Sequence, residues 1–262
     1  MITDTSAAFS VRMSKTRASL VHLLLSVAAA LVVIFLIFFV WYPWPFHTML
    51  GGLSLLGLIV GVDVVCGPLL TFLLWSQSKT RLALAVDCTL IACIQVVALA
   101  YGLYTVVEAR PVYVVFEVDR LRVVSAVDID AGELPEATER FRSLPWLGPR
   151  WISVRDPRDN DELLQSVEQS LAGKEPAVRP GWWQDYAQGV SAMLQRARPI
   201  ADLQRARSSQ LSLLEGAVRN AGVPATELVW LPLISRHNTE WIVLLHRVTG
   251  QPLAYAPIDG FF

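Results

Sequence analysis

Residues 19–41 read SLVHLLLSVAAALVVIFLIFFVW, a stretch that contains no Asp, Glu, Lys or Arg. A helix needs about 20 apolar residues to cross a hydrocarbon core of about 30 Å. The stretch is longer than the roughly 7–15 apolar residues of a signal peptide, and no small-x-small cleavage site follows it. Instead, residues 41–45 (WYPWP) have the aromatic and proline composition of a membrane interface. We therefore predict a retained membrane-spanning helix.

Two further apolar segments have the length of a span, at about residues 49–75 and 82–107. The first of these contains Asp63, which costs about 3 kcal/mol near the bilayer centre. Residues 50–74 also contain 15 Leu, Ile, Val or Phe residues, and each favours insertion by roughly 0.3–0.6 kcal/mol. The sum favours insertion, so the sequence predicts a bundle of three transmembrane helices at about residues 19–41, 49–75 and 82–107.

Charge divides the chain at about residue 107. Residues 1–107 contain 3 acidic and 5 basic side chains, whereas residues 108–262 contain 20 acidic and 17 basic ones. The first part is too apolar for a wholly soluble enzyme or a disordered chain, and the second has no basic excess to bind nucleic acid. Residues 108–262 are long enough for one domain with its own core.

The orientation in the membrane follows from the positions of Lys and Arg in the short loops. The arm formed by residues 1–18 contains Arg12, Lys15 and Arg17, and the loop before residue 82 contains Lys79 and Arg81. The loop at residues 42–48 contains none. The pattern predicts a multi-pass protein of the bacterial inner membrane, with a cytoplasmic N-terminus and with residues 108–262 in the periplasm.

The periplasmic part is predicted to be an α+β domain, one antiparallel sheet with helices inserted in its middle. Its strands are expected where β-branched and aromatic residues concentrate, and its helices where the apolar period is close to 3.6 residues. The expected strands are 113–118, 121–127, 228–234, 240–247 and 252–256. The expected helices are 135–143, a helix that begins at 159 or 160, 182–196 and 199–220.

The second of these helices has the clearest signals. Asp159 or Asn160 can cap its start, and Gly173 follows its end. Its apolar residues share one face: Leu163, Leu164, Val167 and Leu171.

Signatures of catalysis or metal binding are lacking in the sequence. His22, His47, His237 and His246 have no metal-ligand spacing on a helix, and there is no H-E-x-x-H, G-x-S-x-G or Walker motif. The three cysteines, at positions 66, 88 and 93, all lie in apolar segments. We expect no catalytic residue, no cofactor, no metal site and no enzymatic activity.

Polar residues within the predicted spans are the candidate functional residues. Asp63 and Gln95 lie near the middle of their spans, so they are expected at the same depth. Asp87 is about two turns from the cytoplasmic end, where it can meet Lys79 or Arg81. Such groups bond the spans to one another, contact a partner's transmembrane helix, or form part of a proton path. The sequence leaves these alternatives open.

Small residues and a proline mark the same region. Pro68, after Gly67, has no N–H to offer the carbonyl of Val64, so a helix kink is expected there. Gly57 and Gly61 form a small-xxx-small pair that favours close helix packing.

Several stretches resemble the TfpX/TfpZ-type type IV pilin accessory proteins. They are residues 61–71 (GVDVVCGPLLT), 98–102 (ALAYG) and 108–120 (EARPVYVVFEVDR), together with Asp87 and Gln95. The likeness is dense from about His22 to Ile129 and thinner beyond. It implies an inner-membrane protein, encoded with a particular pilin, that influences how much pilus is assembled or displayed. It supplies no catalytic residue.

The expected function is therefore that of an accessory factor for type IV pilus biogenesis. Its expected partners are a type IV pilin or the pilus assembly machinery and the lipid bilayer, with no nucleic acid and no small-molecule substrate. The alternative is a membrane-anchored sensor or ligand-binding protein with an outward domain, although the cytoplasmic segments are too short for a signalling module. A membrane enzyme would need a nucleophile paired with a base, or a Cys-x-x-Cys motif, and Cys88 and Cys93 do not have that spacing.

Overall fold

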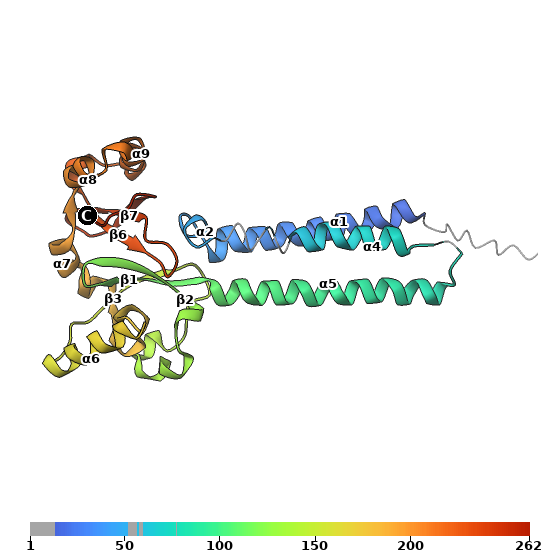
Figure 1. Cartoon of the computed structure of the whole chain (residues 1–262), viewed down its shortest axis with the longest axis horizontal. Helices are drawn as coiled ribbons and strands as arrows, with labels where there is room; N and C mark the ends of the chain where they lie inside the picture. The colour runs from blue at the N-terminus through green and yellow to red at the C-terminus, as the bar shows by residue number, and fades with distance from the viewer. Residues whose placement is uncertain (1–13, 52–56, 58–59, 77) are drawn as a thin grey trace, which may run out of the picture. The chain divides into compact units, whose positions relative to one another are not determined.

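The computed structural model of the chain describes residues 14–51, 57, 60–76 and 78–262 (Figure 1). The chain divides into two compact units. The helical unit comprises residues 1–36 and 53–105, and the sheet unit comprises residues 37–52 and 106–262.

Two helices of the described chain are long and apolar enough to cross a membrane, Lys15–Trp41 and Leu82–Ala109. The first consists of α1 (Lys15–Phe35) and a π-helical end, Leu36–Trp41, and it begins at Ser14, whose hydroxyl accepts a hydrogen bond from the Arg17 N–H. The second is α5 (Arg81–Ala109). The predicted spans at 19–41 and 82–107 both lie within helices of sufficient length.

The predicted span at 49–75 differs from the structure. Its described helical part is a shorter apolar helix, Asp63–Leu74, made of a π turn at Val62–Cys66 followed by α4 (Gly67–Leu74). Residues 52–56 and 58–59 lie outside the described residues. Within the described chain there are thus two helices of membrane length, not three. Pro68 lacks the N–H that would continue the α-helical ladder, and the wider π turn lies immediately before it.

The sheet unit is built on one eight-stranded sheet in which β4, β3, β1, β2, β6, β7 and β8 are neighbours in that order, with β5 paired to β6. The strands are β1 (Pro111–Glu117), β2 (Arg120–Ser125), β3 (Arg150–Val154), β4 (Trp183–Asp185), β5 (Arg198–Pro199), β6 (Leu228–Ile234), β7 (Trp241–His246) and β8 (Pro252–Ala256). The five predicted strands correspond to β1, β2, β6, β7 and β8.

The sheet is mixed, so the prediction of an antiparallel sheet was wrong. β1 is parallel to β3, and β2 is parallel to β6, while the other pairs are antiparallel. The β1–β2 hairpin lies between β3 and β6, which come from distant parts of the chain. A local sequence pattern marks a strand but does not say which distant strand lies beside it.

Both faces of the central strands are buried, which explains their nearly continuous apolar sequence. In β1, Val114 and Phe116 belong to the core on one face, whereas Tyr113 and Val115 belong to the core on the other. The first face is covered by α7 (Tyr186–Arg196) and α2 (Phe46–Met49). The second face is covered by α8 (Ile200–Ala206), α9 (Leu211–Ala221) and short 3₁₀ segments.

The helices were predicted with mixed success. Residues 135–143 form no α-helix but parts of two 3₁₀ segments, Ala131–Glu136 and Glu139–Phe141. The helix predicted at 182–196 begins only at Tyr186, because Trp183–Asp185 pairs with β3 as β4. The helix predicted at 199–220 is divided into α8 and α9. The helix expected to start at 159 or 160 is α6 (Asn160–Leu171), and Asp159 caps it.

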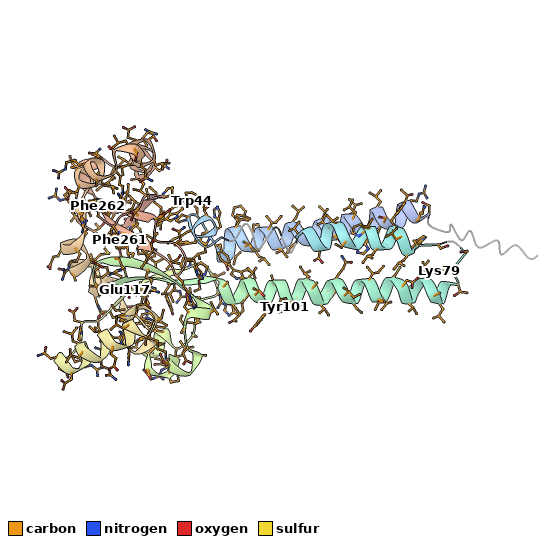
Figure 2. The ribbon with its side chains drawn as sticks, in the orientation of Figure 1. Trp44, Lys79, Tyr101, Glu117, Phe261 and Phe262 are labelled. Carbon is orange, nitrogen blue, oxygen red and sulfur yellow. The ribbon has the colours of Figure 1, made fainter. Side chains whose placement is uncertain are left out.

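Residues 42–50 pack into the sheet unit, a contact that the sequence did not suggest. The Tyr42 hydroxyl donates a hydrogen bond to the carbonyl of Val106 at 2.9 Å, and Phe46 and Met49 are buried in the core beneath the sheet. Trp41 and Tyr42 are therefore buried, although their composition suggested a membrane interface, whereas Trp44 is exposed (Figure 2). Tertiary contacts with the sheet unit override the local aromatic signal.

Candidate functional site

Four polar side chains come together among the apolar helices of the helical unit. They lie on four different elements: His22 on α1, Asp63 in the π turn, Thr71 on α4 and Gln95 on α5. We call them the polar cluster.

Hydrogen bonds join the members of the polar cluster in a chain. The Gln95 amide donates from Nε2 to the backbone carbonyl of Asp63 at 3.1 Å, and Gln95 Oε1 lies 2.5 Å from His22 Nε2. His22 Nδ1 lies 2.5 Å from Thr71 Oγ1. Because Gln95 Oε1 can only accept, His22 Nε2 carries the proton. In the neutral ring Nδ1 then accepts the hydrogen bond from the Thr71 hydroxyl.

Gly67 and Pro68 let the helices approach closely at this point. A Cβ atom at Gly67 would overlap the side-chain amide of Gln95, so with any other residue here that amide would have to leave its present position. The carbonyl of Pro68 accepts a hydrogen bond from the Ser19 hydroxyl at 2.8 Å. The Gly67-Pro68 sequence therefore marks the contact of α4 with both α1 and α5.

The carboxyl group of Asp63 takes a smaller part in these bonds than its backbone does. Asp63 is 7% exposed, and its Oδ1 atom is buried with no hydrogen-bond partner in the described part of the chain. A buried polar atom left without a partner is costly. Asp63 is therefore the member of the cluster with hydrogen-bonding capacity to spare.

The remaining candidates lie apart from the cluster. Asp87 forms an ion pair with Lys79 at 2.6 Å, and Lys79 lies in the loop that leads into α5 (Figure 2). Gly57 and Gly61 are exposed, and a Cβ atom at either position would meet none of the described residues within 4 Å. The structure thus brings together Asp63, Gly67, Pro68 and Gln95, and leaves Asp87, Gly57 and Gly61 outside.

His22 and Thr71 are the members that the sequence did not single out, and His22 is the more informative of the two. The signal of His22 was available, because a histidine within an apolar helix of membrane length falls under the same rule as an Asp or Gln there. The imidazole bonds at both nitrogens and so connects α4 to α5 through α1. Chemically, the cluster is suited to hold these helices together and, through the Asp63 carboxyl, to accept a further hydrogen bond.

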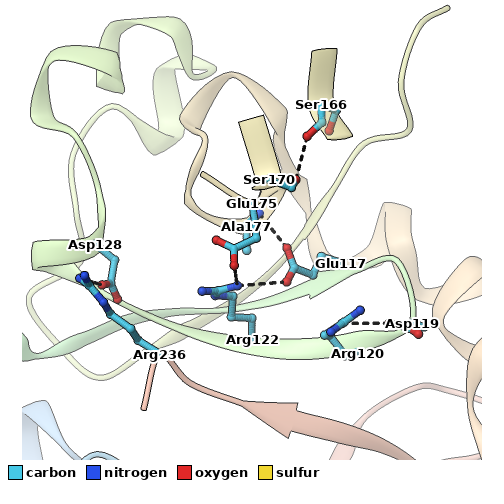
Figure 3. A network of polar contacts seen from close by, with 10 residues as sticks. All are labelled: Glu117, Asp119, Arg120, Arg122, Asp128, Ser166, Ser170, Glu175, Ala177 and Arg236. Atoms are coloured by element: carbon cyan, nitrogen blue, oxygen red, sulfur yellow. Dashed lines mark hydrogen bonds and ion pairs between the residues drawn. The ribbon is translucent and has the colours of Figure 1, made fainter. Parts of the chain in front are cut away.

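A second polar network lies in the sheet unit, at the end of β1 (Figure 3). Glu117 accepts a hydrogen bond from the Ala177 N–H at 3.0 Å, and Arg122 lies between Glu117 and Glu175, at 3.7 and 2.8 Å respectively. Burial raises the pKa of the Glu117 carboxyl above its ordinary value, and the Arg122 guanidinium opposes that rise. The network fixes the 3₁₀ segment Pro176–Val178 against the sheet.

The fold and the polar cluster together define a class of protein. It has apolar helices of membrane length that hydrogen-bond to one another through partly buried polar side chains, joined to a mixed-sheet domain.

Comparison with known proteins specifies the family. The sequence profile of fimbrial assembly protein FimB matches residues 11–51. The fimbrial assembly protein of serogroup I from Dichelobacter nodosus is 38% identical over 242 residues, which cover 92% of this chain and 94% of that protein. The protein of serogroup E1 from the same organism matches with the same identity and coverage. The protein of serogroups C1 and C2 is 48% identical over 117 residues, 45% of this chain and 89% of that protein.

No solved structure matches the chain. Because two relatives are 38% identical over 92% of this chain, the chain belongs to the fimbrial assembly protein family.

Proposed function

We propose that the protein is an inner-membrane accessory factor for type IV pilus biogenesis, of the TfpX/TfpZ type, which modulates the assembly or display of a cognate pilin. The observation that carries the proposal is the match over 92% of the chain to proteins named fimbrial assembly proteins. The stretches at 61–71 and 108–120 support the finer assignment, since they resemble the pilin accessory proteins. The proposed role is non-enzymatic.

The proposed topology has three spans, with residues 1–18 in the cytoplasm and residues 108–262 in the periplasm. The middle span would consist of the helix Asp63–Leu74 and the residues just before it. The loop at 42–50 supports this arrangement. It packs in the core of the sheet unit, through Phe46 and Met49, so the loop and the sheet must lie on the same side of a membrane. The positive residues of the arm and of the loop at 79–81 then lie on the other side.

The polar cluster fits such a role, because hydrogen bonds between apolar helices stabilise their association in lipid. Gln95 and His22 would hold the spans together, while the Asp63 carboxyl would be available to a pilin helix in the same membrane. A pilin that waits in the membrane by an apolar helix, with its head domain in the periplasm, would meet both units of this protein.

The function is tested by deletion and complementation. Loss of the gene should remove most surface pili, and a plasmid copy should restore them, as counted by electron microscopy and by immunoblot of sheared pili. A deletion strain with normal pili and normal twitching would reject the proposal.

The topology is tested separately with reporter fusions to Phe262. Alkaline phosphatase should be active there, because it folds only outside the cytoplasm. An active cytoplasmic reporter at the same position would overturn the topology but not the role in piliation.

A further inference from the structure

Helix α6 exposes the face that an amphipathic helix normally buries. Leu163, Leu164, Val167 and Leu171 are 46%, 69%, 52% and 86% exposed, whereas Ser166, on the opposite side, is 6% exposed. A helix on the surface of a folded domain usually turns its apolar stripe to the core. We call these four side chains the α6 stripe.

Polar contacts hold α6 in this orientation. Arg179, itself buried, donates to Ser166 Oγ at 2.6 Å and to Gln169 Oε1 at 2.7 Å. Arg155 forms a two-pronged ion pair with Glu162, at 2.6 and 2.9 Å. The helix is fixed by charged and hydrogen-bonded groups on its inner side, so the exposure of the α6 stripe is not the result of a loosely attached helix.

An aromatic ring completes this attachment. The guanidinium groups of Arg155 and Arg179 each lie 4.5 Å from the centre of the Trp182 ring. Cation–π contacts of this kind stabilise the positions of both arginines. The inner side of α6 thus contacts the rest of the sheet unit, whereas the α6 stripe on its outer side is exposed.

Acidic residues border the α6 stripe. Asp161 and Glu168 are exposed and lie one turn from Leu164, and neither forms an ion pair in the described part of the chain. The segment 159–171 has four acidic residues and no Lys or Arg. An apolar stripe with this acidic edge is complementary to a partner whose apolar side chains are bordered by positive charge.

We propose that the α6 stripe is the docking surface for a pilus component that presents an apolar strip flanked by Lys or Arg. The inference rests on the proposed function for the identity of the partner. The chemistry of the contact follows from the exposure of the α6 stripe and from the charge of the acidic residues beside it. An exposed apolar patch with a charged border is typical of a protein interface.

Two other occupants fit the surface less well. Helices that lie on a bilayer carry Lys and Arg beside their apolar face, whereas α6 carries only acidic residues there. A second copy of the chain would bring Asp161 and Glu168 against the same acidic residues, and like charges at such distances repel.

The test is site-specific photo-cross-linking in cells that express the full-length protein. A benzophenone amino acid at position 167, in the middle of the stripe, should form an adduct recognised by antibodies to the pilin or to another pilus assembly component. The same probe at Val248, which is 76% exposed on a different surface, is the matched control and should give no such adduct. An adduct with a second copy, with a protein outside the pilus system, or with lipid would overturn the inference, as would no adduct.

Substitutions test the energetics of the contact. The double variant Leu164→Gln, Leu171→Gln should lower the yield of the adduct about tenfold, the effect of losing roughly 1.4 kcal/mol of binding. Asp161→Lys with Glu168→Lys should lower it further at low salt. Val248→Gln should leave the yield unchanged. Equal yields in all these variants would also overturn the inference.

Piliation separates failure of this inference from failure of the proposed function. If deletion of the gene removes pili while the stripe variants assemble normal numbers, only the docking surface is wrong. If deletion leaves the pili unchanged, the proposed function itself is wrong.

Discussion

The helical unit and the sheet unit distribute their apolar side chains in opposite ways. In the sheet unit, every residue of β1 and of β6 is buried. In the helical unit, only 6% of the most apolar 18-residue stretch of α5 is buried. Ile94, Val96 and Val97 are all more than half exposed. The groups that are buried together in the helical unit include Asp63 and Thr71.

This contrast is the one expected if the proposed topology holds and the two units fold in different solvents. In water, burial of apolar surface drives folding, so apolar side chains move inward. In lipid, apolar side chains gain nothing by moving inward, and helices associate through close packing and hydrogen bonds between polar groups. The described helices have the second pattern. Helix α6 has polar contacts inside and apolar groups outside although it belongs to the sheet unit, which is why a protein partner is the simplest account of its outer face.

The largest expected effect is on the core of the sheet unit. Trp230 is fully buried, and its indole donates to the carbonyl of Pro199 at 3.1 Å. Trp230→Ala should lower the free energy of unfolding by about 3–5 kcal/mol, because it leaves a cavity and an unpaired carbonyl. Denaturant unfolding of the detergent-solubilised protein, followed by far-UV circular dichroism, measures the loss.

A matched substitution in the helical unit sharpens the comparison. Val97 on α5 is 68% exposed, so Val97→Ala should change the free energy of unfolding by no more than about 0.5 kcal/mol. Similar losses for the two variants would mean that the exposed side chains of α5 pack against a second protein in the detergent-solubilised sample.

The second prediction concerns the polar cluster. Asp63→Leu should weaken association with a pilin helix by about 0.6–2 kcal/mol and lower surface piliation, because it removes the carboxyl group that would bond to that helix. The hydrogen bond from Gln95 to the backbone carbonyl of residue 63 does not depend on this side chain. Asp63→Asn keeps a hydrogen-bonding group of the same shape and should retain most piliation. The protein should still accumulate in the membrane fraction in both cases, as checked by immunoblot.

The relation between the two variants distinguishes the alternatives for Asp63. If Asn is as defective as Leu, a titratable proton is required and the proton path gains support. If Leu behaves as wild type, Asp63 is dispensable for piliation.

The third prediction concerns the hairpin between β1 and β2. Val118 has a φ of +52°, a backbone conformation that costs a β-branched residue roughly 1–2 kcal/mol. Its side chain is 63% exposed, so it contributes little packing. Val118→Asn should therefore stabilise the sheet unit by about 1 kcal/mol, since Asn tolerates this conformation.

The readout is the melting temperature, which should rise by roughly 2–4 °C for a unit of this size. Val248→Asn is the control, because Val248 is exposed and is not among the non-glycine residues with a positive φ. A lower melting temperature for Val118→Asn would show that the valine side chain makes a contact worth more than the strain.

The smallest expected effects are two opposite dependences of stability on pH within the sheet unit. The pKa of Glu117 is raised by burial, so its contribution to stability is greatest below its ordinary pKa of 4.5 and declines as the pH rises. Hydrogen bonds from Arg155 and from the Arg158 N–H lower the pKa of Glu162 to about 2. The contribution of Glu162 is therefore present above pH 4.5 and is lost as the pH falls towards 2.

Comparison of Glu117→Gln and Glu162→Gln with the wild type tests the two signs. The stability of wild type minus that of Glu117→Gln should fall as the pH rises above 4.5, because the raised pKa of Glu117 favours the protonated, neutral carboxyl in the folded state. The stability of wild type minus that of Glu162→Gln should instead rise from pH 2 to 4.5. If both differences changed in the same direction, one of the two assigned environments would be wrong.

Features set by near neighbours in the chain were predicted well. The apolar helices α1 and α5, the strands β1, β2, β6, β7 and β8, and the helix α6 with its Asp159 cap follow from length, composition and period. Gly173, expected just after α6, has a φ of +86°, which suits glycine at that position. Each of these features depends on residues within a turn or two of one another, so the sequence alone contains the information.

The candidate site was predicted in part for the same reason. Asp63, Gln95 and the Gly67-Pro68 pair were recognisable, because a polar group or a proline within an apolar span is a local anomaly. That Gln95 binds the backbone of Asp63, and that His22 joins Gln95 to Thr71, depends on how three helices rotate against one another. Hydrophobic periodicity does not fix those rotations when the surroundings of the helices are themselves apolar.

By itself the sequence determined which segments are apolar helices, which are strands and where α6 begins and ends. Only the tertiary structure decided that β3 lies beside β1, that residues 42–50 pack under the sheet, and that the stripe of α6 points outward. The physical reason is the range of the interactions. Helix and strand formation depends on backbone hydrogen bonding and side-chain period over a few residues, whereas strand order and the choice of buried face depend on the free energy of contacts between residues far apart in the chain.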